Sequence, residues 1–259
     1  MINIKYFREY RAKLGFSNQG DVKAFFGAKD ILPTIDYGYI NELNQRLFEI
    51  IDKINNLVVD NLKIENVKNF YHKNILSVYE ILKENDILLR LNNQGRRRED
   101  VYFSWMRGFV ISAYFTKAIS KIFNISEDKI SLIGDDDLQN IENFKRTPKA
   151  DLELHLSEKE ILRIEVQSGF QGINDIKQHK VLEAKRIKRE ENISSLVLHF
   201  DLFNGQVAFV KIDEIEDNSV NWITRQQMEG QTVFNIDQNY FLWKLTENPP
   251  SLIELQSIL

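Results

Sequence analysis

Two acidic residues in the stretch KADLELHLSEKEILRIEVQSGF, residues 149 to 170, are the first candidates for chemistry. The stretch alternates apolar and polar residues on both sides of a polar turn, which is typical of a β-hairpin. The apolar faces of the two strands are even-numbered in both, so they are buried together only if the numbers of residues paired across the hairpin add up to an even value. A turn centred on Glu158 gives pairs whose numbers add up to 316. That register places Asp151 opposite Glu165 on one face of the hairpin.

The proximity of Asp151 and Glu165 needs a physical explanation. Opposed strand residues have Cβ atoms about 5 Å apart, and like charges at that separation destabilise a sheet. Either one carboxyl keeps its proton, as coupled acids do, or a divalent cation lies between them, because hard cations prefer oxygen ligands. In the second case the backbone carbonyl of Val166 would add a third oxygen. The hairpin is therefore interpreted as a metal site, the alternative being the solvated polar face of an edge hairpin.

The same residues carry a resemblance to a known family. They are PKAD at residues 148–151 and, after thirteen further residues, EVQ at residues 165–167. On consecutive strands after a helix, these motifs resemble those of the PD-(D/E)XK nuclease superfamily, best known from type II restriction endonucleases. The resemblance covers residues 96 to 212. It departs from the family pattern in two places: two residues separate Pro148 from the acid, and Gln167 replaces the family's lysine, as in the active E-X-Q variants.

The resemblance implies Mg²⁺-dependent hydrolysis of double-stranded DNA at a specific sequence. It implies that Asp151 and Glu165 ligate the metal together with the carbonyl of Val166, and that Gln167 positions the attacking water. A glutamine has no charge and orients water only by hydrogen bonds. The metal must then supply most of the charge neutralisation, with Lys177 or Lys180 as a possible helper from the next helix.

Basic residues near these motifs are candidates for binding DNA phosphates. Arg96, Arg97 and Arg98 are consecutive, and residues 177–189 hold six Lys or Arg and one acid, including Lys177 and Lys180. A solvated loop and an ordinary exposed helix face are the competing interpretations. Glu99 is a possible auxiliary metal ligand, although an acid near a helix N-terminus is also favoured by the helix dipole.

Other polar residues give weaker signals. Asp135, Asp136 and Asp137 suggest a second cation site or, more simply, a polar loop. His155 and His199 lie on predicted strands without other His or Cys at ligand spacing, so we expect them to be ordinary surface or core histidines. The sequence contains no glycine-rich phosphate loop, dinucleotide fingerprint or nucleophile elbow.

Composition limits the class of protein. Hydrophobic residues make up 43% and charged residues 28% of the 259 residues, as in globular proteins. The net charge is −4, so any nucleic-acid surface must be local. There are no cysteines, which excludes disulfides and thiolate metal sites and fits a cytoplasmic location. No apolar run is long enough for a membrane span, so we expect no membrane partner.

Hydrophobic periodicity predicts an α/β fold with a mixed central β-sheet flanked by helices and a helical N-terminal region. The resemblance implies that the sheet and its helices form a restriction-endonuclease-like core. Residues 15–36 are expected to form a loop around a short helix, and a turn is expected at Asn204-Gly205. The remaining predicted elements are helices within 37–92, a buried helix at 101–123, strands at 129–135, 195–203 and 206–212, the hairpin, and a helix within 172–191 capped by Asn174 or Asp175.

Three regions are predicted along the chain: a helical N-terminal region at 1–93, a PD-(D/E)XK-like catalytic core at 94–212, and a C-terminal extension at 213–259 packed on the core. The function predicted is that of a type II restriction endonuclease, which we expect to act as a homodimer because a symmetric duplex site favours two-fold symmetry. The alternatives are another nuclease of the superfamily, in repair or mobile-element handling, and a non-catalytic DNA-binding protein with the same fold.

Overall fold

The computed structural model describes residues 4–28, 31, 34–91, 96–133, 138, 150–158, 160–226 and 230–256. Contacts divide the chain into two compact units, Met1–Asp36 and Tyr37–Leu259. Within the described ranges, every helix is too short or too polar to cross a lipid bilayer. The region boundaries predicted after residues 93 and 212 stay a prediction.

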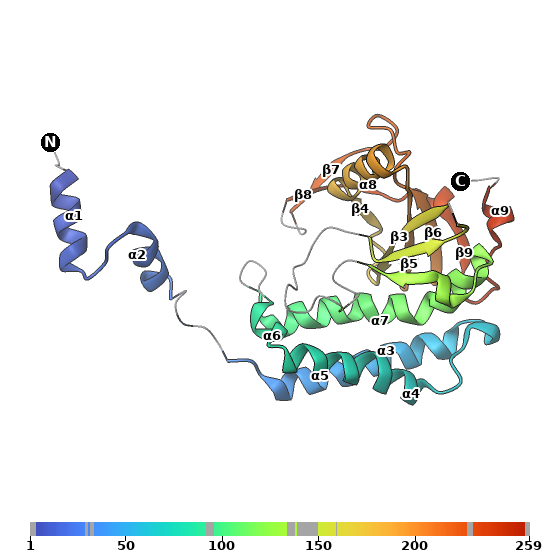
Figure 1. Ribbon diagram of the computed structural model, residues 1–259, viewed down its shortest axis with the longest axis horizontal. Coiled ribbons are helices and arrows are strands. Elements are labelled where there is room, and N and C mark those ends of the chain that lie inside the picture. Colours follow the sequence, from blue (N-terminus) through green and yellow to red (C-terminus); the bar gives the residue numbers. More distant parts are fainter. Residues whose placement is uncertain are drawn as a thin grey trace. The chain divides into compact units, whose positions relative to one another are not determined.

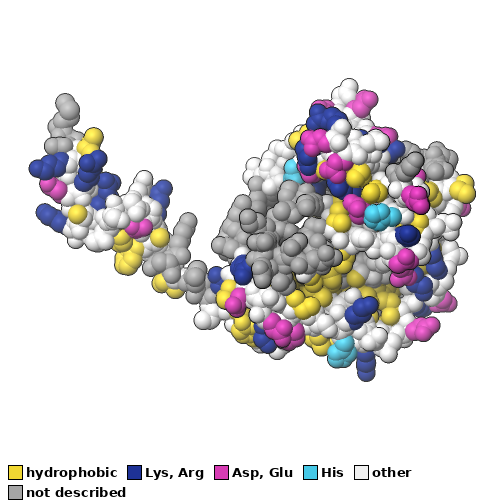
Figure 2. Space-filling model, in the orientation of Figure 1, with side chains coloured by type: hydrophobic (Ala, Val, Ile, Leu, Met, Phe, Trp, Pro, Cys, Tyr) yellow, Lys and Arg dark blue, Asp and Glu magenta, His cyan; other side chains and the backbone are white. Residues whose placement is uncertain are grey.

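The first unit contains two short helices, α1 (Ile4–Lys13) and α2 (Gln19–Phe26). The Asn18 side chain caps α2 by accepting a hydrogen bond from the Asp21 amide at 3.0 Å, which satisfies one of the helix's first N–H groups. The short helix predicted within residues 15–36 is thus confirmed. Neither helix has a buried residue, and Figure 2 shows lysine and arginine side chains gathered over α1.

The second unit begins with a layer of helices, as predicted for residues 37–92. They are α3 (Tyr37–Leu57), a 3-10 turn (Asp60–Leu62), α4 (Val67–Tyr71), a π-helical turn (His72–Leu76), α5 (Ser77–Glu84) and α6 (Ile87–Arg90). Figure 1 shows α3, α4 and α5 on the side of α7 (Arg98–Phe123) that faces away from the sheet.

Helix α7 is the central helix of this unit and is buried on several faces, as its sequence predicts. Toward α3, the buried hydroxyl of Tyr102 donates to Asn44 Oδ1 at 2.5 Å. Toward the sheet, Phe115 stacks on Phe200 with 4.1 Å between the ring centroids. The helix begins at Arg98, three residues before the predicted start, with two acids in its first turn, where the helix dipole stabilises negative charge.

The main sheet has six strands in the order β1-β2-β3-β5-β6-β9. Their bounds are β1 (Ile130–Leu132), β2 (Leu152–His155), β3 (Ile161–Gly169), β5 (Ser194–Asp201), β6 (Gln206–Lys211) and β9 (Phe241–Lys244). Strands β3 and β5 are parallel and the other neighbours antiparallel, so the sheet is mixed. Helices lie on both of its faces, with α7 on one and α8 (Gln178–Glu191) on the other (Figure 1), and the predicted α/β class with a mixed sheet flanked by helices is confirmed.

The β2–β3 hairpin has the register that the sequence predicts. Leu152 pairs with Ile164, and Leu154 pairs with Leu162, so each pair sums to 316. The apolar side chains of the hairpin therefore share the buried face, since a slip by one residue would have exposed them. The turn predicted at residues 204–205 is also present, and Gly205 adopts a φ of +69°, which favours glycine.

The helix predicted within residues 172–191 begins later than expected, and neither predicted cap is correct. Helix α8 begins at Gln178, and its N-cap position is Lys177. The residues before it form strand β4 (Asp175–Lys177), which pairs with β8 (Gln231–Asn235) in a small antiparallel sheet completed by β7 (Ile223–Arg225). Fully buried Ile176 pairs with Phe234, a contact from the distant C-terminal segment that overrides the local helical preference.

The C-terminal segment contributes strands to both sheets. Its strands β7 and β8 build the small sheet, β9 extends the main one, and a 3-10 turn (Gln238–Tyr240) and helix α9 (Leu252–Gln256) complete it. Buried residues of α8, β5, β6 and β8 form one hydrophobic cluster on this side of the main sheet. The cluster holds α8 against β5 and β6, beside the polar face of the hairpin.

Candidate functional site

Glu165 lies on β3 and is 9% exposed. Its Oε1 atom lies 2.7 Å from Nζ of Lys180, which projects from the first turn of α8. Burial raises the pKa of the Glu165 carboxyl above its ordinary value, while the positive charges of Lys180 and then Lys177 act to lower it. The structure therefore brings together three of the predicted site residues.

Asp151 lies directly before β2 and binds the backbone of β3. Its Oδ2 atom accepts a hydrogen bond from the Val166 N–H at 2.7 Å. That nitrogen is bonded to the carbonyl carbon of Glu165, so the Asp151 carboxylate lies against the Glu165 backbone. The N–H and C=O of one strand residue point to the same side, so the Val166 carbonyl faces the same edge of β3 as Asp151.

This contact differs in detail from the arrangement expected from the sequence. The antiparallel pairing ends with Leu152 and Ile164, and the Asp151 N–H donates to the Ile164 carbonyl at 3.1 Å. Asp151 thus lies one residue beyond the regular ladder. A carboxylate-to-backbone hydrogen bond, rather than a regular cross-strand pair, brings it to Glu165.

The oxygen atoms here are suited to a hard divalent cation. The carboxylates of Asp151 and Glu165 and the carbonyl of Val166 are the ligand types that Mg²⁺ and Ca²⁺ prefer. Among the described residues, no group of three or more His, Cys, Asp or Glu is arranged around a metal position. Two carboxylates are nevertheless sufficient for Mg²⁺, which usually keeps several waters and binds substrate phosphate. The ammonium beside Glu165 shows that this carboxylate accepts a cationic partner.

Gln167 is the next residue of β3 on the same face as Glu165, because side chains alternate along a strand. It is half-buried, and its neighbour on the parallel strand β5 is His199. An amide at this position offers hydrogen-bond donors and an acceptor but no charge. The positive charge beside Glu165 therefore comes from the ammonium of Lys180 and not from residue 167.

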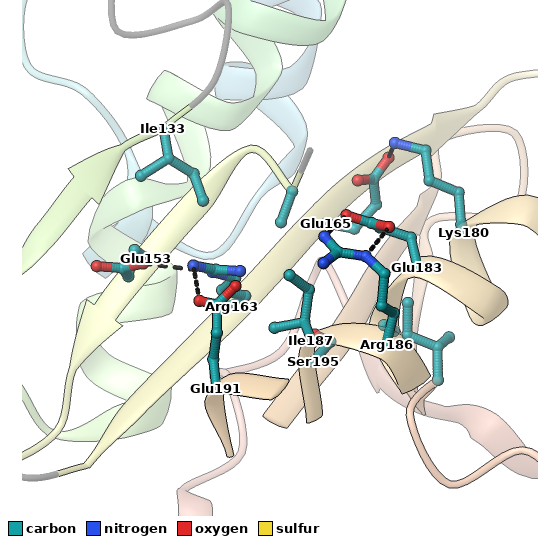
Figure 3. Close-up of a pocket in the computed structure, with 13 residues that line it drawn as sticks. Ile133, Glu153, Arg163, Glu165, Lys180, Glu183, Arg186, Ile187, Glu191 and Ser195 are labelled. Atoms are coloured by element: carbon teal, nitrogen blue, oxygen red, sulfur yellow. Dashed lines mark hydrogen bonds and ion pairs between the residues drawn. The ribbon is translucent and has the colours of Figure 1, made fainter. Parts of the chain in front are cut away.

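A pocket of about 270 Å³ lies between the polar face of the hairpin and α8, and Glu165 and Lys180 form one end of it (Figure 3). At the other end Arg163 contacts Glu153 at 3.3 Å and Glu191 at 2.8 Å. On the α8 side, Arg186 pairs with Glu183 at 2.8 Å and with Glu190. The charged residues that line the pocket are Glu153, Arg163, Glu165, Lys180, Glu183, Arg186 and Glu191.

Lys180 was named from the sequence as a possible helper of the site, whereas the acids Glu183 and Glu191 of α8 were not predicted to line this pocket. A usable signal was present, because Lys180, Glu183, Ile187 and Glu191 follow at three- and four-residue spacing and must share one face of a helix. Combined with the hydrophobic stripe of α8, that spacing predicts a charged edge directed at the hairpin.

Comparison with known proteins gives little sequence similarity. No protein-family model matches the chain, and no curated protein matches it. Among solved structures, the chain is similar to Hjc, a Holliday junction resolvase from the archaeal hyperthermophile Archaeoglobus fulgidus. The two are 14% identical, the match covers 45% of this chain and 82% of the resolvase, and the TM-score is 0.29.

The predicted arginine cluster precedes and begins α7. Arg96 Nη2 donates to Ser104 Oγ at 3.0 Å. Arg97 lies over the Tyr39 ring at 4.9 Å and 3.6 Å from the buried carboxylate of Glu99. The Arg97 and Glu99 side chains therefore contact each other, and the predicted roles of these residues in DNA and metal binding stay predictions.

The remaining residues singled out in the sequence are only partly described by the structure. Pro148, Lys149 and the acids at 135–137 lie outside the described residues. His155 is partly exposed and lies 3.6 Å from Glu153 in the hairpin. The catalytic assignment of Asp151, Glu165 and Gln167 stays a prediction.

His199 gives a testable pH dependence. It is buried, its Nε2 lies 2.7 Å from Asn174 Oδ1, and burial lowers the pKa of its imidazole to about 4. Unfolded histidine titrates near 6.5, so between pH 6.5 and 4 the unfolded state binds more protons and the folded state loses stability as the pH falls. Between pH 7 and pH 4 the free energy of unfolding should therefore fall less in His199→Gln than in the wild type, by up to about 3 kcal/mol. Urea unfolding at the two pH values measures this difference.

The matched control for this prediction is His155→Gln, since His155 is the partly exposed histidine of β2. That variant keeps His199, so it should still lose stability on acidification through this residue. If wild type and His199→Gln lost the same free energy of unfolding on acidification, His199 would not be held neutral in the folded protein.

Proposed function

We propose that this protein is a metal-dependent DNA nuclease of the PD-(D/E)XK type that hydrolyses phosphodiester bonds of double-stranded DNA. The observation that supports it most is the convergence at β3. Buried Glu165 is held by Lys180 at 2.7 Å, and the Asp151 carboxylate binds the adjoining Val166 amide at 2.7 Å. The carboxylates of Asp151 and Glu165 and the carbonyl of Val166 are the oxygen ligands that Mg²⁺ prefers.

In this proposal Asp151, Glu165 and the carbonyl of Val166 hold Mg²⁺. When bound, Mg²⁺ lowers the pKa of a coordinated water and neutralises charge on the phosphate. Gln167 lies on the same face of β3 and orients the attacking water by hydrogen bonds. Lys180 supplies the positive charge that Gln167 lacks, because its ammonium is already placed beside Glu165.

The finer proposal is a type II restriction endonuclease that cuts at a specific sequence and acts as a homodimer. It rests on the E-X-Q motif at residues 165–167 and on the fold, in which a long helix precedes the hairpin and a helix follows it. Another nuclease of the superfamily would share the same site. A non-catalytic DNA-binding protein would keep Lys180 on Glu165 permanently.

Incubation of plasmid with the protein and Mg²⁺ separates these possibilities. Discrete fragments are expected for a restriction enzyme, and mapping the ends of the fragments then gives the cut site. A smear would indicate a general nuclease, whereas a retarded but intact plasmid would indicate binding alone. An intact and unshifted plasmid would contradict the whole proposal.

Gln167→Lys tests the water-positioning role. Because lysine is the usual residue of the motif and can both donate hydrogen bonds and supply charge, we expect cleavage within about tenfold of the wild-type rate, or faster. Gln167→Met has similar length without hydrogen-bonding groups and should cut at least about tenfold more slowly. Equal single-turnover rates for Gln167→Met and wild type would remove Gln167 from the mechanism.

A further inference from the structure

Arg107 is a half-buried cation on α7 that lies between aromatic rings. Its guanidinium carbon is 4.5 Å from the ring centroid of Phe170 and 5.8 Å from that of Phe103. Among the described residues, no carboxylate lies within ion-pair distance of Arg107. Burial, and then the charge of Arg96, lower the pKa of its guanidinium. An arginine in this setting carries a desolvated charge that an anion would stabilise.

Arg96 brings a second guanidinium to the same place. It donates to the hydroxyl of Ser104 at 3.0 Å, and Ser104 lies one helical turn before Arg107 on α7. Residues three apart on a helix share a face, so the two guanidinium groups lie along one edge of α7. Two neighbouring arginines repel each other unless an anion lies between them, and their planar forks match the oxygens of a phosphate.

The position of this pair relates it to the candidate active site. Phe170, which stacks on Arg107, directly follows the last residue of β3, Gly169. Glu165 lies five residues before Phe170, or about 17 Å along the chain at about 3.3 Å per residue. Arg107 therefore contacts the residue that directly follows the strand carrying Glu165, which places it within reach of a duplex bound at that strand.

We propose that Arg107 and Arg96 form a binding site for a backbone phosphate of the DNA strand that enters the candidate active site. The inference rests on the proposed function and adds residues that the motif does not contain. The phosphate contact is independent of sequence and fixes the duplex relative to β3, since backbone contacts position DNA without reading it. Phe170 holds the Arg107 guanidinium plane by stacking on it.

Fluorescence anisotropy with a 30-base-pair duplex of arbitrary sequence, in EDTA to prevent hydrolysis, measures this contact. For Arg107→Gln and for Arg96→Gln we expect the dissociation constant to rise about tenfold. Each variant should also reduce the slope of log K against log salt by about 0.9, and the double variant by about 1.8, because each removes one phosphate contact. Arg107→Lys should keep most of the slope because it keeps the charge.

Arg46→Gln is the matched control, since Arg46 is an exposed arginine of α3 paired with Glu49, and it should leave affinity and slope unchanged. Thermal melting identifies any variant that fails to fold. If Arg107→Gln fails to fold, the test of the phosphate site rests on Arg96→Gln alone, because Arg96 is exposed. Unchanged slopes in a chain that binds DNA would overturn this site and leave the proposed nuclease intact. A wild-type chain that binds no DNA would overturn both.

Discussion

Asp151→Asn should reduce Mg²⁺-dependent cleavage of duplex DNA by more than about 100-fold. Mutating a residue that only hydrogen-bonds to a metal ligand already lowers metal affinity or activity by about 10- to 100-fold, and Asp151 is proposed as a ligand itself. The asparagine oxygen can still accept the hydrogen bond from Val166 N–H, so the fold should be retained. DNA affinity in EDTA should stay equal or increase, because a carboxylate that repels phosphate has been removed. Single-turnover cleavage and anisotropy on one preparation measure the two effects separately.

Glu153→Gln is the control for this experiment. Glu153 is an acid of the same hairpin, two residues further on, and it pairs with Arg163 rather than with the β3 backbone. The variant loses the same formal charge and should cleave within about threefold of the wild type, as expected for a partly exposed ion pair. Full cleavage by Asp151→Asn would exclude Asp151 as a metal ligand.

Lys180→Met is the variant with the second-largest expected effect, and it should change both activity and stability. Without the ammonium at 2.7 Å, the buried carboxylate of Glu165 loses its partner. The side chains of the pair are 20% and 11% exposed, so we expect a loss of about 1 to 3 kcal/mol in unfolding free energy at pH 7. Cleavage should fall by about 100-fold, because the site loses its fixed positive charge.

A double variant separates the chemical role of Lys180 from the structural one. Lys180→Met combined with Glu165→Gln removes the uncompensated charge and should recover most of the stability while remaining inactive. Lys185→Met is the helix control, because Lys185 lies on the same helix α8 as Lys180 but pairs with the largely exposed Asp217 of the C-terminal segment, and the variant should affect neither quantity strongly. Wild-type cleavage by a stably folded Lys180→Met would show that Lys180 is structural only.

The sequence predicts the hairpin well because the controlling interaction is local. Alternation of Leu152 and Leu154 with polar residues defines a buried face, and the even-sum condition together with a turn centred on Glu158 gives the observed register. The buried helix α7 was predictable for a similar reason, since its apolar residues surround the helix. Its true start at Arg98 depends on terminal electrostatics that periodicity does not detect.

The features that sequence analysis missed depend on contacts between distant segments. Residues 175–177 form a strand because β8, more than fifty residues later, supplies an edge and covers Ile176. The stacking of Arg107 on Phe170 requires α7 and the end of β3 to be adjacent, which no spacing in the sequence encodes. Lys177 and Lys180 were named as alternative helpers of the site, but the contact of Lys180 with Glu165 was not predicted, because it depends on the start of α8 at Gln178.

The central claim is that the oxygens of Asp151 and Glu165 bind one divalent ion at the edge of β3. Anomalous diffraction from crystals of the full chain soaked in Mn²⁺ tests it most directly, because manganese scatters anomalously and accepts the same oxygen ligands as Mg²⁺. The account predicts one ion in contact with both carboxylates. Crystals that bind Mn²⁺ elsewhere, with Glu165 still held by Lys180 and no ion at Asp151, would contradict it.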